Sequence, residues 1–197
     1  DDDYLNLTYL LDHAVKEGAE VINNPSSVRN HNEKLSILNF KEIIPPTMVT
    51  STSSSVVNFL KIHEKIVLKP INGMGGNGIF VIDKSDKNIN SILETITVNE
   101  TKVMMAQKFI PAITEGDKRI IVIKGEPLPF CLARIPDGKD FRANLAKGGT
   151  GIANELTADD IKIVNVIKKY LVKSKLDFVG IDVIGKYLTE INVTSPT

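Results

Sequence analysis

Apolar and polar residues along this chain follow both helical and strand periodicities, and neither kind of segment dominates. Helices are predicted at residues 4–18, from about residue 26, and at 32–40, 53–63, 88–97 and 157–173. Strands are predicted at residues 21–23, 48–50, 66–69, 79–82, 103–108, 117–123, 128–135, 178–184 and 187–192. Because several of these strands are joined by short turns as hairpins, we expect an α+β fold with mainly antiparallel sheet.

Capping residues and glycines refine the ends of these elements. Thr157 and Asp160 have the spacing of a capping box at the start of the last helix, and Ser53 is the expected N-cap of the helix that ends at residue 63. Residues 136–154 are polar and contain four glycines, which predicts a mobile loop of the length usual for a lid.

The segment from residue 66 to residue 82 is the most distinctive one. An apolar run ends in Lys69, four glycines follow within six residues, and a second apolar run follows the glycines. The spacing of Gly73, Gly75 and Gly78 matches the dinucleotide fingerprint, but that fingerprint requires a helix directly afterwards. Here the second run is β-branched and aromatic and predicts a strand. The pattern therefore favours a glycine flap that donates backbone N–H groups to nucleotide phosphates, with Lys69 supplying positive charge.

Composition restricts the possible partners. The chain has 197 residues, of which 42% are hydrophobic, and a formal net charge of zero. No global field therefore favours nucleic acid or an anionic membrane, and no apolar run approaches the roughly 18 residues of a membrane span. The single cysteine, Cys131, excludes an internal disulfide, fits a reducing cytoplasm and is expected to be buried. Since the chain begins Asp-Asp-Asp without methionine, we expect it to be an internal fragment.

The last predicted hairpin carries a candidate metal site. Glu190 and Asn192 are two residues apart on one strand and share a face, and magnesium takes one or two such carboxylates together with nucleotide phosphates. A two-residue turn would place Asp182 on the opposite face, whereas a three-residue loop at 185–187 would bring it directly across from Glu190. The metal interpretation therefore predicts a loop of odd length. The alternative is a solvated polar face on an edge hairpin.

Basic residues provide candidates for binding phosphates or carboxylates. The candidates are Lys34, Lys69, Arg119, Arg134, Arg142 and Lys147. Lys69 ends an apolar strand and Arg134 is flanked by apolar residues on a hairpin, so ordinary surface charge explains these two less well than the others. Arginines bind such groups through bidentate, charge-assisted hydrogen bonds. The three histidines lie on predicted helices without a second ligand at metal spacing.

Short motifs spread along nearly the whole chain carry a resemblance to a known family. They are Asn32-Glu33-Lys34-Leu35, Leu68-Lys69-Pro70 with Gly73-Met74-Gly75-Gly76, Met105-Ala106-Gln107, Gly116-Asp117-Lys118-Arg119, Cys131-Leu132-Ala133-Arg134-Ile135-Pro136, Asn144-Leu145-Ala146 with Gly148-Gly149, Phe178-Val179-Gly180 through Asp182, and Thr189 to Thr197. Together they resemble the prokaryotic glutathione synthetases of the ATP-grasp superfamily. Lys-Pro with a glycine loop is shared by many ATP-grasp ligases, whereas Ala-Arg-Ile-Pro and Glu-Ile-Asn-Val-Thr-Ser-Pro-Thr are more particular to this family.

The resemblance implies an ATP-grasp fold, in which two α+β subdomains grip ATP, and the activity of an ATP-dependent carbon–nitrogen ligase. The implied substrates are ATP, γ-glutamylcysteine and glycine, and the products are glutathione, ADP and phosphate, formed through an acyl phosphate. The implied metal is Mg²⁺ or Mn²⁺. The family further suggests a cytoplasmic homo-oligomer, a tetramer, without nucleic-acid or membrane partners.

The resemblance also implies roles for individual residues. The residues implied to bind the nucleotide are Lys34 and Lys69 at the phosphates, Gly73, Met74, Gly75 and Gly76 in the flap, and Gln107, Lys108, Phe109 and Ile110 in a hinge beside adenine. The implied catalytic residues are Arg119, Arg134 and Asn144, the last within a lid at 142–149. The implied metal ligands are Asp182, Glu190 and Asn192.

Three parts are expected along the chain. Residues 1–30 are expected to be the end of an N-terminal α/β domain, 31–108 the small ATP-grasp subdomain with its linker and flap, and 109–197 the large subdomain, shortened at its C-terminus. The family extends beyond both ends of this chain, and its N-terminal domain binds part of the peptide substrate. Two alternatives therefore stay open: another ATP-grasp ligase that joins an amine to a different carboxylate, and a catalytically incompetent nucleotide-binding fragment.

Overall fold

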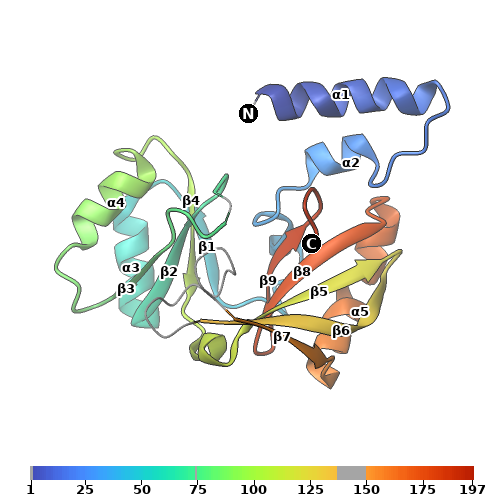
Figure 1. Ribbon diagram of the computed structural model, residues 1–197. Helices are drawn as coiled ribbons and strands as arrows, with labels where there is room; N and C mark the ends of the chain where they lie inside the picture. The colour runs from blue at the N-terminus through green and yellow to red at the C-terminus, as the bar shows by residue number, and fades with distance from the viewer. Residues whose placement is uncertain (1, 74, 137–149) are drawn as a thin grey trace.

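The computed structural model describes residues 2–73, 75–136 and 150–197, and it contains two antiparallel sheets, each with helices on one face (Figure 1). The α+β class with antiparallel sheet is therefore confirmed. None of the helices in the described part of the chain is both long and apolar enough to cross a membrane.

The first sheet has four strands in the order β1-β4-β2-β3. Their bounds are Thr47–Thr50 for β1, Lys65–Pro70 for β2, Phe80–Asp83 for β3 and Met104–Lys108 for β4. Helices α3 (Ser53–His63) and α4 (Ile89–Thr97) lie on its outer face (Figure 1). The apolar positions of β2 and β4 alternate, so Ile66, Leu68, Met104 and Ala106 are buried under these helices. The intervening positions, among them Lys69, point to the opposite face, which is the one towards the second sheet.

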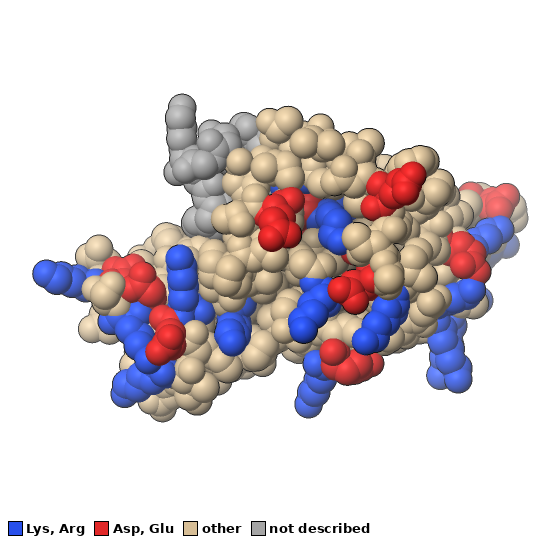
Figure 2. Space-filling model, turned by 90° about the horizontal axis from the view of Figure 1, so that it is seen from below, with Lys and Arg blue, Asp and Glu red and all other residues tan. Residues whose placement is uncertain are grey.

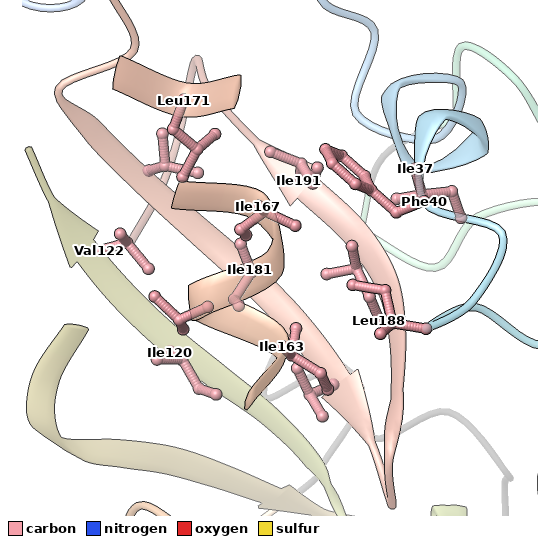
Figure 3. Packing of buried hydrophobic residues seen from close by; sticks show 14 of the residues in the cluster. Ile37, Phe40, Ile120, Val122, Ile163, Ile167, Leu171, Ile181, Leu188 and Ile191 are labelled. Atoms are coloured by element: carbon pink, nitrogen blue, oxygen red, sulfur yellow. The ribbon is translucent and has the colours of Figure 1, made fainter. Parts of the chain in front are cut away.

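The second sheet has five strands in the order β7-β6-β5-β8-β9. Their bounds are Asp117–Ile123 for β5, Glu126–Ile135 for β6, Thr150–Glu155 for β7, Phe178–Ile184 for β8 and Tyr187–Asn192 for β9. Helix α5 (Ala158–Lys173) covers one face of this sheet and packs Ile163, Ile167 and Leu171 against it (Figure 3). The capping box predicted for α5 is confirmed, because the Thr157 hydroxyl accepts from the backbone N–H of Asp160.

The segment that precedes β1 packs on the second sheet rather than on the first. The 3₁₀ helix η1 (Ser36–Asn39) contributes Ile37 to the same core as α5, and Phe40 follows it there (Figure 3). The backbone N–H of Leu188 donates to Ile43 O at 2.8 Å, and that of Ile191 donates to Glu33 O at 2.9 Å. These bonds hold the segment along the outer edge of β9.

The N-terminal region is attached at the start of β8 and just after the end of β9. Helix α1 (Asp2–Lys16) lies above α2 (Pro25–Asn30) and apart from both sheets (Figure 1). Asn24 caps α2 with its side chain, as its position before Pro25 predicts. The neighbouring Asn23 attaches this region to β8, since its amide nitrogen donates to Phe178 O and its amide oxygen accepts from Phe178 N–H.

Four predictions of helix, strand and cap positions are wrong. Residues 21–23 form no strand, and residues 22 and 23 form a bend, because Asn23 uses its side chain to bind the backbone of β8. The 32–40 helix is reduced to η1, because the Asn32 side chain accepts from the N–H groups of Lys34 and Leu35 and forms a turn. The N-cap of α3 is Thr52, not Ser53.

The fourth error concerns the long polar loop. Its last residues form β7, which pairs with β6 from Ile135↔Thr150 to Phe130↔Glu155. All six residues of β7 are exposed, so this edge strand carries no apolar alternation that a sequence pattern could reveal. The rest of the predicted lid, at residues 137–149, lies outside the described residues.

Candidate active site

Three strands of the second sheet place one charged side chain each in a single row. Glu190 of β9 pairs with Asp182 of β8, and Asp182 pairs with Arg119 of β5. Residues that are directly paired in an antiparallel sheet point to the same face. This row therefore lies on the face opposite α5, where Asn192 also points, two residues beyond Glu190.

The register of the β8–β9 hairpin differs from both alternatives that the sequence left open. The turn has two residues, since Ile184 pairs with Tyr187, so the predicted odd-length loop is wrong. A bulge then shifts the pairing between Val183↔Leu188 and Asp182↔Glu190. The bulge brings Asp182 directly across from Glu190, which is the arrangement that the metal interpretation needs.

Two arginines hold the Asp182 carboxylate. Arg119 donates from Nε to Oδ1 at 2.5 Å and from Nη2 to Oδ2 at 3.0 Å, which is a bidentate pair. The Arg134 Nη2 lies 3.0 Å from Asp182 Oδ1 and donates to Asp117 Oδ2 at 2.5 Å. Asn192 adds a longer contact of 3.4 Å from Nδ2 to Asp182 Oδ2. The predicted residues Arg119, Arg134 and Asn192 thus all contact Asp182.

Burial and neighbouring charges change the proton affinities of these carboxyl groups. Burial, together with the charge of Asp182, raises the pKa of Asp117 to about 7 against the opposing charge of Arg134. Burial also raises the pKa of Glu190, opposed by Lys69 and reinforced by Asp182. For Asp182 burial acts in the same direction, but the hydrogen bonds and charges of Arg119 and Arg134 lower its pKa below the ordinary value. For Asp117 and Glu190, the neighbouring cations therefore offset only part of the cost of burying a negative charge.

Two lysines approach the same row, Lys69 from the first sheet and Lys34 from the segment that runs along β9. Lys69, at 8% exposure, lies near the end of β2, and its Nζ is 3.8 Å from Glu190 Oε1. Lys34, at 2% exposure, lies 3.9 Å from the same oxygen and donates to Gly73 O at 2.6 Å. Lys34 also forms an ion pair with Glu33. The candidate phosphate lysines and the candidate metal ligand Glu190 therefore meet between the two sheets.

The glycine flap joins β2 and β3, as the sequence predicts, since these strands pair antiparallel from Lys65↔Asp83 to Leu68↔Phe80. Gly75 has a φ of +63°, and a Cβ placed on it would meet no described atom within 4 Å. The backbone at Gly75 thus lies open on one side, which suits a loop that approaches a ligand closely. Met74, between the flap glycines, lies outside the described residues.

The predicted adenine hinge starts in the last residues of β4 and leads out of the first sheet. Gln107 is buried at 2% exposure and donates from Nε2 to Thr47 Oγ1 at 3.0 Å. Lys108 ends β4, and its N–H donates to Pro46 O at 2.9 Å. Phe109 and Ile110 then lead towards the second sheet, with the ammonium of Lys65 4.3 Å from the centre of the Phe109 ring. Gln107 and Lys108 therefore end β4, and Phe109 and Ile110 begin the connection between the sheets.

The described residues fit a divalent cation of the magnesium type. In the described part of the chain, no three His, Cys, Asp or Glu side chains form a group that could hold a metal, so a cation here would depend on fewer carboxylates together with other ligands. Asp182, Glu190 and Asn192 supply two carboxylates and one amide on one face, and magnesium takes its other ligands from water and phosphate. The raised pKa of the buried Glu190 is consistent with this, because it marks a carboxylate whose charge the two lysines do not fully stabilise.

Three contacts of this site involve residues that were not predicted. Asp117 binds Arg134, Glu33 binds Lys34, and Pro196 O accepts from Arg119 Nη1 at 3.0 Å. Asp117 could have been found, because it lies two residues before Arg119 on a predicted strand and so shares its face. The contact with Pro196 depends on Gly180, where any Cβ would lie 2.0 Å from that carbonyl oxygen. Asn144 and the 142–149 segment lie outside the described residues.

The charges on the exterior are mixed. On the face shown in Figure 2, lysine and arginine side chains alternate with aspartate and glutamate side chains, and neither sign forms a continuous region there. This distribution agrees with the zero formal net charge of the chain.

The fold resembles those of solved ATP-grasp ligases. The ATP-grasp ligase PsnB, in complex with precursor peptide PsnA2 and AMPPNP, has a TM-score of 0.67 and 18% sequence identity, over 97% of this chain and 59% of that chain. The D-cycloserine synthetase DcsG has a TM-score of 0.73 at 12% identity, over 99% of this chain and 72% of that chain. The fold is therefore that of the ATP-grasp class.

Sequence similarity identifies the family within this class. Residues 33–197 match the family model of the prokaryotic glutathione synthetase, ATP-grasp domain. The glutathione synthetase of Nitrosomonas europaea is 51% identical over 197 residues, which are 100% of this chain and 62% of that relative. The chain therefore belongs to the prokaryotic glutathione synthetase family, and the predicted resemblance is confirmed. It spans about 62% of the length of the curated relatives it matches.

Proposed function

We propose that this protein is an ATP-dependent ligase that joins γ-glutamylcysteine and glycine, giving glutathione, ADP and phosphate. The observation that carries the proposal is the meeting of the Glu190–Asp182–Arg119 row with Lys34 and Lys69 between two sheets of an ATP-grasp fold. Phosphoryl transfer needs positioning and neutralisation of charge more than a protein nucleophile. The residues at this site are suited to that requirement, and the relatives named glutathione synthetase indicate glutathione as the product.

The nucleotide would lie between the flap and the hinge. Lys34 and Lys69 neutralise phosphate oxygens, and the flap formed by Gly73, Gly75 and Gly76, whose backbone is open at Gly75, donates N–H groups to them. Gln107 to Ile110 border the adenine. Mg²⁺ or Mn²⁺, held by Asp182, Glu190 and Asn192, would supply further neutralisation of the phosphate charge when bound. The assignments of Met74 to the flap and of Asn144 to the lid rest on the family resemblance.

The two arginines, Arg119 and Arg134, would contact the reacting phosphoryl and acyl groups. The cysteinyl carboxylate attacks the γ-phosphorus, the bond from that phosphorus to the β–γ bridging oxygen breaks, and ADP leaves. The glycine amine then attacks the acyl carbon, phosphate leaves, and the amine loses a proton. Arg119 and Arg134 carry charge that stabilises the negative oxygens formed in both steps. Their pairing with Asp182 and Asp117 fixes the guanidinium groups beforehand, so little reorganisation is needed.

Three wider features belong to the same proposal. The chain would consist of an N-terminal remnant at 1–30, a small subdomain at 31–108 and a large subdomain at 109–197. The protein would act in the cytoplasm, which the single buried Cys131 suits. It would form a homo-oligomer, a tetramer by the family resemblance, with small molecules and not nucleic acid as its partners.

Substrate profiling of the full-length protein tests the proposal. ADP release is measured with γ-glutamylcysteine and glycine, and with other pairs of carboxylate and amine. We expect release to be strong with γ-glutamylcysteine plus glycine and to match the glutathione formed. Strong release with another acid and none with this pair would indicate a different ATP-grasp ligase. ATP binding without turnover of any pair would indicate a non-catalytic nucleotide-binding module.

A further inference from the structure

The bulge in β9 contains one extra residue, Thr189. It stands between Leu188, which pairs with Val183, and Glu190, which pairs with Asp182. Thr189 is buried, at 3% exposure, although its side chain is polar. A buried polar residue at a bulge calls for a physical reason, since bulges recur where a side chain must be redirected.

The extra residue decides which side chains of β9 face the site. Leu188 and Ile191 are both fully buried in the core beneath α5, although they are three residues apart (Figure 3). In a regular strand such residues point to opposite faces. With the same two-residue turn and no bulge, Thr189 would stand across from Asp182 and Glu190 would point away from it. The bulge therefore makes it possible for Glu190 to face Asp182 while Leu188 stays in the core.

The Thr189 hydroxyl ties the bulge to the strand that carries Asp182. Its Oγ1 donates to the backbone carbonyl oxygen of Asp182 at 3.1 Å, and this bond is buried. The donor is thus the extra residue itself, and the acceptor is the residue whose side chain must be aligned. Loss of such a donor leaves a buried acceptor with one bond fewer, and the local geometry relaxes.

We propose that Thr189 is a positioning residue for the metal site, because its hydroxyl holds the bulge that aligns Glu190 with Asp182. The inference rests on the proposed role of Asp182, Glu190 and Asn192 as ligands of a divalent cation. Thr189 itself does not bind the cation; it acts through the backbone of its neighbours. Removal of a residue that positions metal ligands typically weakens metal binding by about tenfold or more.

The test compares variants that keep or remove the hydroxyl. Thr189→Val keeps the shape of the side chain without the donor, Thr189→Ala is a second variant without it, and Thr189→Ser retains it. Thr97→Val is a matched control, because Thr97 is also fully buried and also donates to a backbone carbonyl, Leu93 O at 2.7 Å, but lies at the end of α4. Mn²⁺ binding to the full-length protein is measured by electron paramagnetic resonance in the presence of AMPPNP.

We expect Thr189→Val and Thr189→Ala to bind Mn²⁺ roughly tenfold more weakly than the wild type. Thr189→Ser and Thr97→Val should bind it as the wild type does. Unchanged Mn²⁺ affinity in both hydroxyl-free variants, or an equal loss in Thr97→Val, would overturn the inference about Thr189 and leave the metal site itself standing. A wild-type protein that binds no Mn²⁺ with AMPPNP would overturn the proposed metal site and this inference with it.

Discussion

At the scale of single residues, the site depends on charges held close together and away from water. Asp182 forms ion pairs with both Arg119 and Arg134. Glu190, by contrast, has only the ammonium groups of two lysines, at 3.8 and 3.9 Å from its Oε1, and burial raises its pKa. A carboxylate in that condition gains from a cation that can approach more closely than the lysines do. Glu190 is therefore the residue at which the metal interpretation can be tested most selectively.

Replacing Glu190 by glutamine removes the charge and keeps the shape of the side chain. We expect Glu190→Gln to weaken Mg²⁺-dependent binding of AMPPNP by at least roughly tenfold, and therefore to reduce the rise in melting temperature that Mg²⁺ and AMPPNP produce in the wild type. The melting temperature without ligands should be retained, because the variant removes a buried charge. Glu64→Gln is the control, since Glu64 is exposed and pairs with Lys84 at the surface. A ligand-induced rise in Glu190→Gln equal to that of the wild type would refute this role.

The raised pKa of Asp117 predicts a pH dependence of stability. This pKa rises from an ordinary 3.8 to about 7 through burial and the charge of Asp182, so the folded protein binds the proton more readily than the unfolded chain does. The resulting stabilisation is complete below about pH 4 and is lost as the pH rises to about 7. Urea unfolding without metal or nucleotide should show that the free energy of unfolding of the wild type, relative to Asp117→Asn, falls over this range. A difference that is constant or grows with pH would contradict the assignment.

At the scale of elements, the sequence predicted the strands of both sheets better than their registers. The β2–β3 flap, the β5–β6 hairpin and the capping box of α5 follow from alternation, turns and cap spacing, and all are confirmed. The β9 bulge was missed, although Leu188 and Ile191 stand three apart in a strand where alternation predicts two. β7 was missed because an exposed edge strand has no apolar face to detect.

The glycine flap joins β2 and β3 of the first sheet, and its proposed contact with the nucleotide can be tested at Gly75. Gly75→Ala should weaken AMPPNP binding, because alanine disfavours the φ of +63° at this position by roughly 1–2 kcal/mol and shifts the flap. Gly18→Ala is a matched control: Gly18 also has a positive φ, +101°, and open space around it, but it follows α1. Isothermal titration with Mg²⁺ and AMPPNP measures both variants. Equal affinities for Gly75→Ala and Gly18→Ala would show that the flap does not contact the nucleotide.

At the scale of the whole molecule, the site exists because the two sheets face each other. Lys69 comes from the first sheet, Arg119, Asp182 and Glu190 come from the second, and Lys34 lies in the segment that packs on the second sheet. Spacing along the sequence could identify each residue as a candidate, but it could not predict that residues more than a hundred positions apart, such as Lys69 and Glu190, lie close together. That step came from the family resemblance, which the comparisons confirm for the family and the fold.

If ATP activates the cysteinyl carboxylate of the peptide at this site, an oxygen atom must pass from that carboxylate to the released phosphate. The full-length protein is supplied with γ-glutamylcysteine labelled with ¹⁸O in its cysteinyl carboxylate, with ATP, Mg²⁺ and glycine, and the released phosphate is analysed by mass spectrometry. Attack of that carboxylate on the γ-phosphorus requires one labelled oxygen to leave with phosphate, so we predict one ¹⁸O in each phosphate formed from a fully labelled substrate. Phosphate without label, released while glutathione is formed, would contradict the account.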